Sequence, residues 1–445
     1  MFLFGVYLLI HGCQYMRNLL LLTIACSFMV ITANGQTIAI SKWANAALHE
    51  KPLEQAHVGI SIYEPATGKY WYQYQDDKFF TPASNTKIFS LYAGLRLLGD
   101  SLPGIRYYEN DTALFVKGVG DPSFLHPDYT WQPLLQLLQQ TSKQIYLVPA
   151  VNLNKRYGPG WAWGDFADDY QPELNEWPMY GNVVRIYHHR DTSMLVPPLY
   201  DLEATADDTI SSTVTDRDER NNLFFLKYNP KDKGITQTEV PFITGSVQQL
   251  RERLEDTLHK RVGLAVTPPA GAFKILHSIP SDSLFTPMMH RSDNFFAEQT
   301  LLMSAATLWD TISTDRCIQY LLDGDLKSLP HPPQWADGSG LSRYNLFTPR
   351  DFVTVLTLMY QQFPKERLWH ILPTGGKGTM RNYYPEQFVH AKTGTLNGVV
   401  TLSGYLVTKK NKTLVFSVLV NNHHESATSV RRAVERLLTK VWKEY

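Results

Sequence analysis

Strand-like patterns at both ends of this chain constrain its fold more than any other feature. Two alternating apolar runs, residues 58–63 and 70–74, flank a turn with a proline and a glycine, which is typical of a β-hairpin. An amphipathic helical pattern over residues 426–442 closes the chain. Just before it come three further strand-like runs: 389–396, 399–408 and 413–421. We expect the two ends to share one mixed sheet, with helices packed against it.

The middle of the chain has a different pattern. Residues 101–279 hold many short strand-like runs, separated by turn-rich segments and accompanied by two amphipathic helical stretches. Helical patterns resume from about residue 287. A chain of this length can form about two or three domains. We therefore predict an α+β protein in which residues 36–100 and 280–445 form one domain and residues 101–279 form a β-rich insert.

The N-terminus has the pattern of a secretory signal peptide. A basic residue, Arg17, precedes a short apolar run over residues 19–31, and small residues follow up to Gly35. We predict a signal peptide over residues 1–35, with Met16 as the better start. The run is shorter than the ~20 residues of a membrane span. These features predict secretion across the inner membrane to the periplasm or cell envelope, with at most peripheral membrane association.

The overall charge balance excludes some functions. Lys plus Arg and Asp plus Glu both number 42, so the chain has no net charge that would attract nucleic acid. No cluster of potential metal ligands is visible in the sequence, and we expect neither a metal nor a cofactor. The sequence leaves the oligomeric state open.

Ser84 and Lys87 are the first candidate catalytic residues. Pro82 favours a first helical turn, and apolar residues then recur at helical spacing up to a stop at Gly99. Ser84 and Lys87 are three residues apart, so both project from one face of this helix. A hydroxyl beside an amine can form a nucleophile and its base. The pattern is short, however, and roughly one or two chance matches are expected in such a chain.

Two further motifs follow in the chain. Ser292-Asp293-Asn294 begins an apolar helical stretch, and Lys392-Thr393-Gly394-Thr395 lies in the first of the closing strand-like runs. Alone, Ser292 could be a helix N-cap and Lys392 an exposed strand lysine. Ser-x-x-Lys, Ser-x-Asn and Lys-Thr-Gly in this order are, however, the motifs of β-lactamases and penicillin-binding proteins. Their order and placement favour a shared catalytic site.

The chain resembles the class C low-molecular-mass penicillin-binding proteins, which are D-alanyl-D-alanine carboxypeptidase/endopeptidases. The long gap between the first two motifs fits the extra domain that these enzymes carry. Residues 118–122, 337–343, 391–396 and 402–405 also match segments of this family. The resemblance implies a β-lactamase/transpeptidase-like domain, an antiparallel sheet sandwiched by helices, with a β-rich domain inserted between the first and second motifs. The insert looks short, so we expect a second nested subdomain to be reduced or absent.

The resemblance also implies the chemistry. The enzyme would remove the terminal D-Ala from peptidoglycan stem peptides through an acyl-enzyme on Ser84, with cleavage of peptide cross-links as a second activity and β-lactams as covalent inhibitors. Lys87 would act as the base, provided that it is neutral. We expect burial and the like charge of Lys392 to lower the pKa of Lys87 from its usual value of about 10.4. Ser292 would relay the proton to the leaving amine, and Asn294 would hold Lys87 and the substrate amide.

The family pattern assigns substrate contacts to the Lys-Thr-Gly-Thr segment. The backbone N–H groups of Ser84 and Thr395 would form the oxyanion hole. Lys392, with the hydroxyls of Thr393 and Thr395, would bind the terminal carboxylate, and Gly394 belongs to the same substrate-binding strand.

A separate hypothesis concerns Asp165, in the tryptophan-rich run 160–165. In the family a carboxylate of this stretch can reach the cleft and meet the free amino group of a diaminopimelate side chain. An Asp that caps a turn beside the Trp residues is the structural alternative.

Other patterns give no support for a different activity. The glycine-rich run 375–379 lacks Ser or Thr directly after Lys377, so it is not a phosphate loop. Gln171 stands where class A β-lactamases have the deacylating Glu, which argues against fast β-lactam hydrolysis. The His pairs 188–189 and 423–424 have no acid partner and are interpreted as structural. Two alternatives stay open: a relative that hydrolyses β-lactams or esters, and a catalytically silent cell-wall binding protein.

Overall fold

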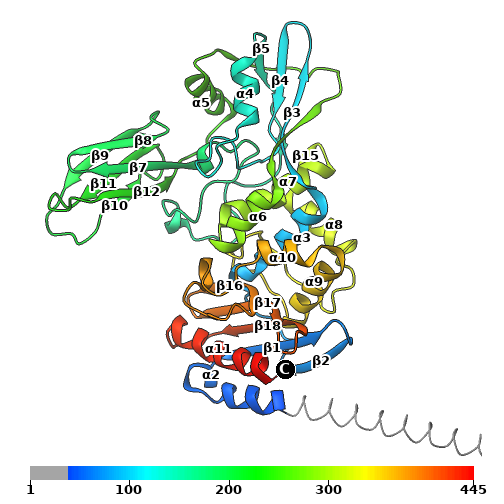
Figure 1. The fold of residues 1–445 in the computed structure, drawn as a ribbon. Helices are drawn as coiled ribbons and strands as arrows, with labels where there is room; N and C mark the ends of the chain where they lie inside the picture. Colours follow the sequence, from blue (N-terminus) through cyan, green and yellow to red (C-terminus); the bar gives the residue numbers. More distant parts are fainter. Residues whose placement is uncertain (1–38, 445) are drawn as a thin grey trace, which may run out of the picture.

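The two ends of the chain meet in one five-stranded antiparallel sheet (Figure 1). The computed structural model describes residues 39–444, so the predicted signal peptide over residues 1–35 and the start at Met16 lie outside the described residues. β1 pairs with β18, and His57 lies opposite Asn421. The strands, in their order across the sheet, are β16 (Val389–Leu396), β17 (Val399–Val407), β18 (Thr413–Asn421), β1 (His57–Glu64) and β2 (Lys69–Tyr74). The predicted sheet shared by both ends is confirmed.

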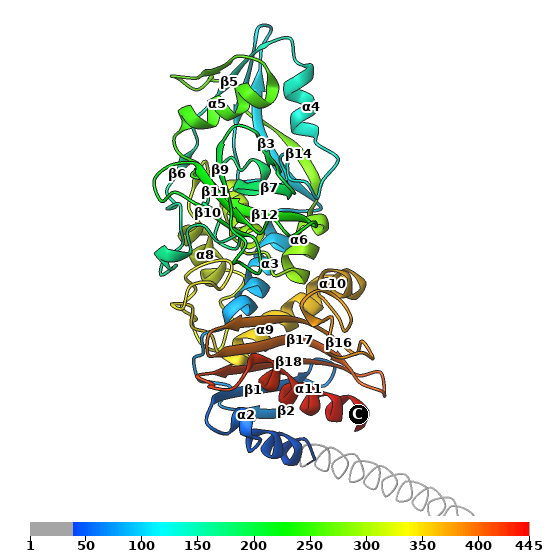
Figure 2. The same cartoon turned by 90° about the vertical axis from the view of Figure 1, so that its left-hand side faces the viewer.

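Helices cover both faces of this sheet, as Figure 2 shows. On one face lie the helix at residues 39–48, α2 (Lys51–Glu54) and α11 (Ala427–Glu444). Nearly every residue of β18 is buried, because its alternate side chains enter the cores on the two faces. The helices of the other face are α3 (Lys87–Leu97), α6 (Ser281–His290), α7 (Asn294–Leu308), α8 (Thr314–Asp323), α9 (Pro349–Gln362) and α10 (Lys365–Ile371). The predicted α+β class, with a sheet sandwiched by helices, is confirmed.

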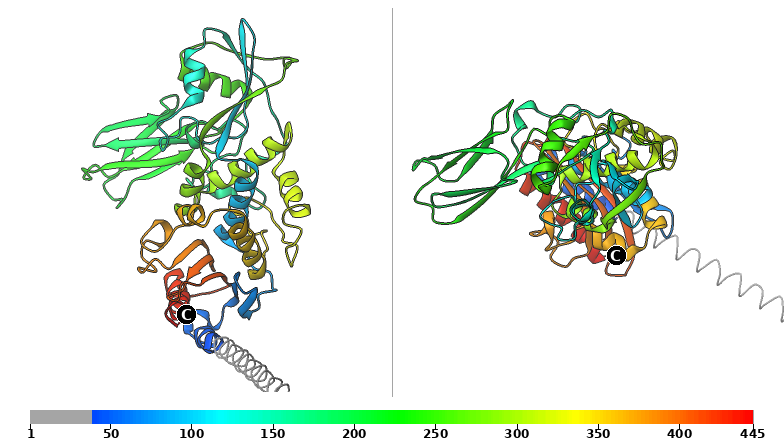
Figure 3. Two further views of the ribbon diagram at one scale, coloured as in Figure 1. Left: turned by 45° about the vertical axis from the view of Figure 1, so that its right-hand side comes forward. Right: turned by 90° about the horizontal axis from the view of Figure 1, so that it is seen from above.

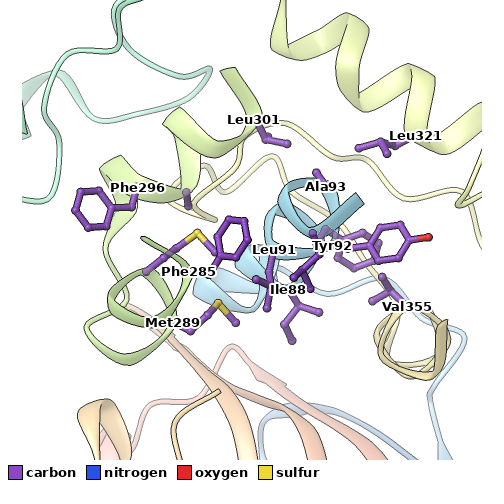
Figure 4. Packing of buried hydrophobic residues seen from close by; sticks show 14 of the residues in the cluster. Ile88, Leu91, Tyr92, Ala93, Phe285, Met289, Phe296, Leu301, Leu321 and Val355 are labelled. Atoms are coloured by element: carbon purple, nitrogen blue, oxygen red, sulfur yellow. The ribbon is translucent and has the colours of Figure 1, made fainter. Parts of the chain in front are cut away.

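Helix α3 runs through the middle of the larger core. Its residues 87–95 are all buried, so it has no polar face, in contrast to a surface helix. Figure 4 shows its apolar side chains between those of α6, α7, α8 and α9. A Cβ at Gly94 would lie 2.7 Å from the Phe285 ring, so glycine allows α3 and α6 to approach closely. This packing fixes the position of the residues at the start of α3.

A second sheet lies beyond these helices. It has the order β13-β5-β4-β3-β14. The chain leaves α3 directly into β3 and returns through β14 into α6, and these two strands pair antiparallel. A segment that leaves and returns through neighbouring strands can be inserted without disturbing the first sheet. Its elements are β3 (Ser101–Glu109), β4 (Ala113–Lys117), α4 (Pro133–Gln140), β5 (Gln144–Leu147), α5 (Val247–Leu258), β13 (Val262–Leu264) and β14 (Lys274–Pro280).

A smaller nested unit extends sideways from the second sheet (Figure 3). It consists of two three-stranded sheets, with the orders β12-β7-β8 and β10-β11-β9, around an apolar cluster of its own. The sequence left open whether a nested unit is reduced or absent, and a small one is present. Its strands are β7 (Val183–His189), β8 (Thr192–Val196), β9 (Asp201–Ala206), β10 (Val214–Arg217), β11 (Leu223–Tyr228) and β12 (Ile235–Pro241).

Short elements complete the described chain. Strand β6 (Val151–Asn152) of the insert pairs with β15 (Thr311–Ile312), next to α7 and α8. The 3-10 turns are η1 (Ala83–Thr86), η2 (Trp163–Asp165), η3 (Tyr180–Asn182) and η4 (Gly378–Met380). Within residues 39–444, none of the helices combines the length and the apolar character that a membrane span requires.

Candidate active site

The three predicted motifs come together in the structure. Lys87 Nζ lies 3.1 Å from Ser84 Oγ and 2.6 Å from Asn294 Oδ1. Lys392 Nζ, from strand β16, donates to Ser292 Oγ at 2.9 Å. The start of α3, the start of α7 and the edge strand of the first sheet thus each supply part of one polar cluster.

The local backbone presents the two serines. Ser84 lies in the 3-10 turn η1, and the regular α-helix α3 begins after this turn, at Lys87. Its neighbour Ala83 has a φ of +48°, and Ser292 has a φ of +63°. Residues other than glycine rarely adopt this left-handed backbone conformation. The alternative that Ser292 is a helix N-cap is wrong, since Asp293 caps α7 by accepting from Phe296 N at 3.0 Å. The Ser292 hydroxyl is therefore available to Lys392.

Lys87 is fully buried, and its amine has a third partner, the carbonyl oxygen of Ser339 at 2.7 Å. Burial lowers the pKa of Lys87 to about 8, against the opposing charges of Asp337, Glu298 and Asp293. A substantial neutral fraction therefore exists near neutral pH, as a general base requires.

The pKa of Lys87 is lowered, as expected, and burial is the largest cause. Lys392 is also fully buried, and its pKa is lowered well below the usual value, first by burial and then by the charges of Lys87 and Arg431. Each of the two lysines disfavours the protonated form of the other, because the repulsion between like charges is reciprocal.

Gly394 brings strand β16 against the turn that holds Ser84. A Cβ at this position would lie 2.8 Å from Pro82 O and 3.0 Å from Ser84 N, so only glycine permits this approach. The contact places the edge of β16, where Thr395 follows, beside the Ser84 backbone. The Thr393 hydroxyl donates to Thr379 Oγ1 at 2.7 Å. The Thr395 hydroxyl accepts from Arg431 Nη2 at 2.5 Å.

A cleft of about 540 Å³ opens above Ser84. Ser84, Asn294 and Thr395 line it from the catalytic motifs, and Asp165 lines it from the insert. Asn294 Nδ2 also donates to the carbonyl of Tyr170 at 3.0 Å, which ties the insert to α7. The further lining residues are Gly160, Ala162, Tyr170, Gly340, Leu341, Arg343, Leu396 and Asn397. Asp165 thus lines the same cleft as Ser84, and its contact with a substrate amino group stays a prediction.

Residues 337–345 form a loop to which the sequence assigned no role in the site. Asp337 organises this loop, because its carboxylate accepts from Gly340 N at 2.8 Å, Ser342 N at 2.6 Å and Asn345 Nδ2 at 2.6 Å. It also accepts from Trp161 Nε1 of the insert at 2.9 Å. The turn-forming residues of this stretch were visible in the sequence, but the carbonyl that it offers to Lys87 leaves no sequence signal.

The histidines interpreted as structural lie away from the cleft. His188 Nδ1 contacts Ser193 Oγ in the nested unit, and His423 Nδ1 contacts the Glu425 carbonyl. Over residues 39–444, no group of His, Cys, Asp or Glu side chains is arranged to hold a metal ion.

Comparison with known proteins identifies the family. Residues 41–441 match Peptidase_S13, the D-Ala-D-Ala carboxypeptidase 3 (S13) family. The chain belongs to this family. The predicted class of penicillin-binding protein, and with it the predicted enzyme type, a serine D-Ala-D-Ala carboxypeptidase, is confirmed for this S13 chain.

Individual relatives of this S13 chain are distant but match over most of their length. It is 23% identical to the D-alanyl-D-alanine carboxypeptidase DacB of Haemophilus influenzae, over 84% of this chain and 88% of the relative. It is 26% identical to a D-alanyl-D-alanine carboxypeptidase of Actinomadura, over 85% and 80% of the two chains. The crystal structure of penicillin binding protein 4 from Haemophilus influenzae superposes with a TM-score of 0.71, at 19% identity, and covers 91% of this chain and 99% of that one. The last match confirms the fold.

Proposed function

We propose that this S13 enzyme removes the terminal D-Ala of peptidoglycan stem peptides with Ser84 as its nucleophile. The observation that carries the proposal is the contact between the hydroxyl of Ser84, which lines the cleft, and the buried Lys87 amine. Neutral Lys87 takes the hydroxyl proton while Ser84 Oγ attacks the carbonyl of the penultimate D-Ala. The N–H groups of Ser84 and Thr395 stabilise the resulting oxyanion.

Collapse of this intermediate breaks the peptide bond and leaves an ester on Ser84. The proton held by Lys87 reaches the leaving D-Ala nitrogen through the Ser292 hydroxyl, which accepts from Lys392 Nζ at 2.9 Å. Water then hydrolyses the ester, which restores the Ser84 hydroxyl and releases the shortened peptide. Asn294 fixes the Lys87 amine during both steps.

The terminal carboxylate of the substrate would bind at strand β16. Lys392 is buried, and within residues 39–444 it forms no ion pair with a carboxylate, so an arriving carboxylate supplies the charge that favours its protonated form. The hydroxyls of Thr393 and Thr395 lie on the same strand and offer hydrogen bonds. Binding of this carboxylate selects substrates that carry a free carboxylate next to the scissile peptide bond.

The insert side of the cleft would recognise the side chain of the stem peptide. Asp165 and Arg343 line the same cleft, so it offers one negative and one positive side chain. The far end of a diaminopimelate side chain carries an amino group and a carboxylate, which match this pair. We assign the amino group to Asp165 and the carboxylate to Arg343.

Two further activities follow from the same nucleophile. A β-lactam carbonyl would acylate Ser84 as the peptide carbonyl does; the related penicillin binding protein 4 from Haemophilus influenzae has been solved in complex with a β-lactam. A cross-link between stem peptides also joins a D-Ala carbonyl to the amine of a D-centre, so endopeptidase cleavage needs no additional group. Peptidoglycan lies outside the cytoplasm, in agreement with the secretion pattern of residues 1–35.

Release of D-alanine from a soluble pentapeptide that ends in D-Ala-D-Ala tests this proposal. The wild type is expected to release one equivalent of D-alanine per peptide, and Ser84→Ala to release none. Release by Ser84→Ala at the wild-type rate would refute the assignment of the nucleophile. Steady-state turnover of nitrocefin in place of a single stoichiometric burst would favour the β-lactam-hydrolysing alternative, and a wild type inert to both compounds would favour the silent binding protein.

A further inference from the structure

A two-residue segment of the 337–345 loop is held by hydrogen bonds from both sides. On one side, α3 donates to its two carbonyls: Ser90 Oγ to Gly338 O at 2.6 Å and Lys87 Nζ to Ser339 O at 2.7 Å. On the other side, the Glu298 carboxylate of α7 accepts from Gly338 N at 2.9 Å and from Ser339 N at 2.7 Å. The donors and acceptors of both residues are therefore satisfied by two helices.

Glu298 is buried between α7 and the loop. Its side chain is 4% exposed, and it lies one helical turn after Asn294, so both point from one face of α7 toward α3. A Cβ at Gly338 would lie 2.9 Å from the Ala297 carbonyl, so glycine lets the loop approach the helix. Asn294 contacts the Lys87 amine directly, whereas Glu298 reaches it through the Ser339 backbone.

The geometry of the amine shows why the Ser339 carbonyl matters. A neutral lysine has two N–H bonds and one lone pair. Asn294 Oδ1 at 2.6 Å and Ser339 O at 2.7 Å accept the two N–H bonds. The lone pair is then left for the third contact, the Ser84 hydroxyl at 3.1 Å. If the Ser339 carbonyl moved, the lone pair would no longer be directed at the proton that it has to remove.

We propose that Glu298 is a positioning residue for acylation, which holds the Gly338–Ser339 backbone so that the Lys87 lone pair faces Ser84. The inference rests on the proposed function of Lys87 as the base. It assigns to an acidic side chain outside the three motifs a measurable effect on the reaction, without contact with the substrate.

Glu298 also contributes to the charge around Lys87. The charged groups that face this amine are Asp293 and Glu298 on α7, Asp337 on the loop and Lys392 on β16. The carboxylates raise the pKa of Lys87, in opposition to burial. Burial and the Asp337 charge in turn raise the pKa of Glu298 itself. Glu298 accepts from two backbone N–H groups, as an ionised carboxylate does, and in this form its replacement by a neutral residue lowers the pKa of Lys87.

The variant Glu298→Gln tests this proposal through the pH profile of acylation by benzylpenicillin. The side chain of glutamine has only one oxygen, so it can accept from one of the two N–H groups of Gly338 and Ser339 and places its own NH2 group against the other. We therefore expect the plateau rate of acylation to fall roughly tenfold. We also expect the acid limb of the profile to move to lower pH by about half a unit or more, because one carboxylate is lost. A plateau rate and an acid limb equal to those of the wild type would overturn the proposal, and so would a lower rate with an unmoved limb.

Two controls separate the possible failures. The wild type is measured in parallel, since a wild type that forms no adduct refutes the proposed function and not the role of Glu298. Ser90→Ala removes the donor to Gly338 O without a change of charge. This variant is expected to lower the plateau rate of acylation several-fold and to leave the acid limb of the profile at the same pH as in the wild type. If Glu298→Gln does not fold, this variant decides, and a wild-type plateau rate in Ser90→Ala would then overturn the proposal.

Discussion

Lys87 Nζ lies 2.6 Å from Asn294 Oδ1, although 207 residues separate the two in the sequence. The inserted strands lie between them in the chain, yet α3 and α7 pack side by side in one core. We predict that Asn294→Ala lowers the rate of acylation by a fluorescent penicillin by roughly 10- to 100-fold, because the amine loses an acceptor that orients it. A rate within twofold of the wild type, at an unchanged thermal midpoint, would contradict this role.

The acylation rate is predicted to rise with pH through the pKa of Lys87. Burial lowers this pKa from 10.5 to about 8, so the neutral, reactive form increases as the pH rises through that value and is complete above it. At pH 7 about one-tenth of the molecules would carry a neutral Lys87. Rates of adduct formation between pH 6 and 10 measure this limb. A rate that stays constant from pH 6 to pH 9 would show that Lys87 is not the base.

Gly394→Ala is predicted to impair acylation strongly. The added methyl group would lie 2.8 Å from Pro82 O and 3.0 Å from Ser84 N, both of them backbone atoms that cannot turn aside. The strand or the turn must move, which disturbs the predicted oxyanion hole, and we expect a loss of about 100-fold or more in the acylation rate. Gly164→Ala is a suitable control, because a Cβ there meets nothing within 4 Å. Equal rates for the two variants would argue against the close approach of β16 to Ser84.

Asp165→Ala is predicted to reduce the preference for diaminopimelate-containing peptides. The carboxylate lines the cleft, and its loss removes the proposed partner of the free amino group. We expect kcat/KM for such a peptide to fall roughly tenfold relative to that for the same peptide with the amino group acetylated. The ratio of the two rates is the informative quantity. A ratio equal to that of the wild type would favour the alternative that Asp165 only caps a turn.

The sequence was sufficient for the parts of the site that are carried by side chains in short motifs. Ser84, Lys87, Ser292, Asn294 and Lys392 were each predicted, and the structure brings them together. The helix α9 and the closing strands were also predictable from their apolar periodicity, and α3 from its apolar residues between Pro82 and Gly99. The roles of these residues in the reaction remain proposals.

What could not be predicted depends on backbone atoms and on distances between elements. The Ser339 carbonyl is available to Lys87 only because Glu298 and Asp337 fix the loop, and a carbonyl is present at every residue. The lowered pKa of Lys87 was predicted, but the three carboxylates that oppose it were not, because their distance from the amine needs coordinates. The nested unit was underestimated, since its strands are short and partly exposed and so give weak patterns.

Intact-protein mass after incubation with benzylpenicillin tests the central claim most directly. A β-lactam that acylates one serine adds its whole mass, since ring opening releases no leaving group. We predict a single adduct of one benzylpenicillin on the wild type, mapped to the peptide that contains Ser84, and no adduct on Ser84→Ala. No adduct on the folded wild type, or an adduct that persists in Ser84→Ala, would contradict the account of Ser84 as the nucleophile.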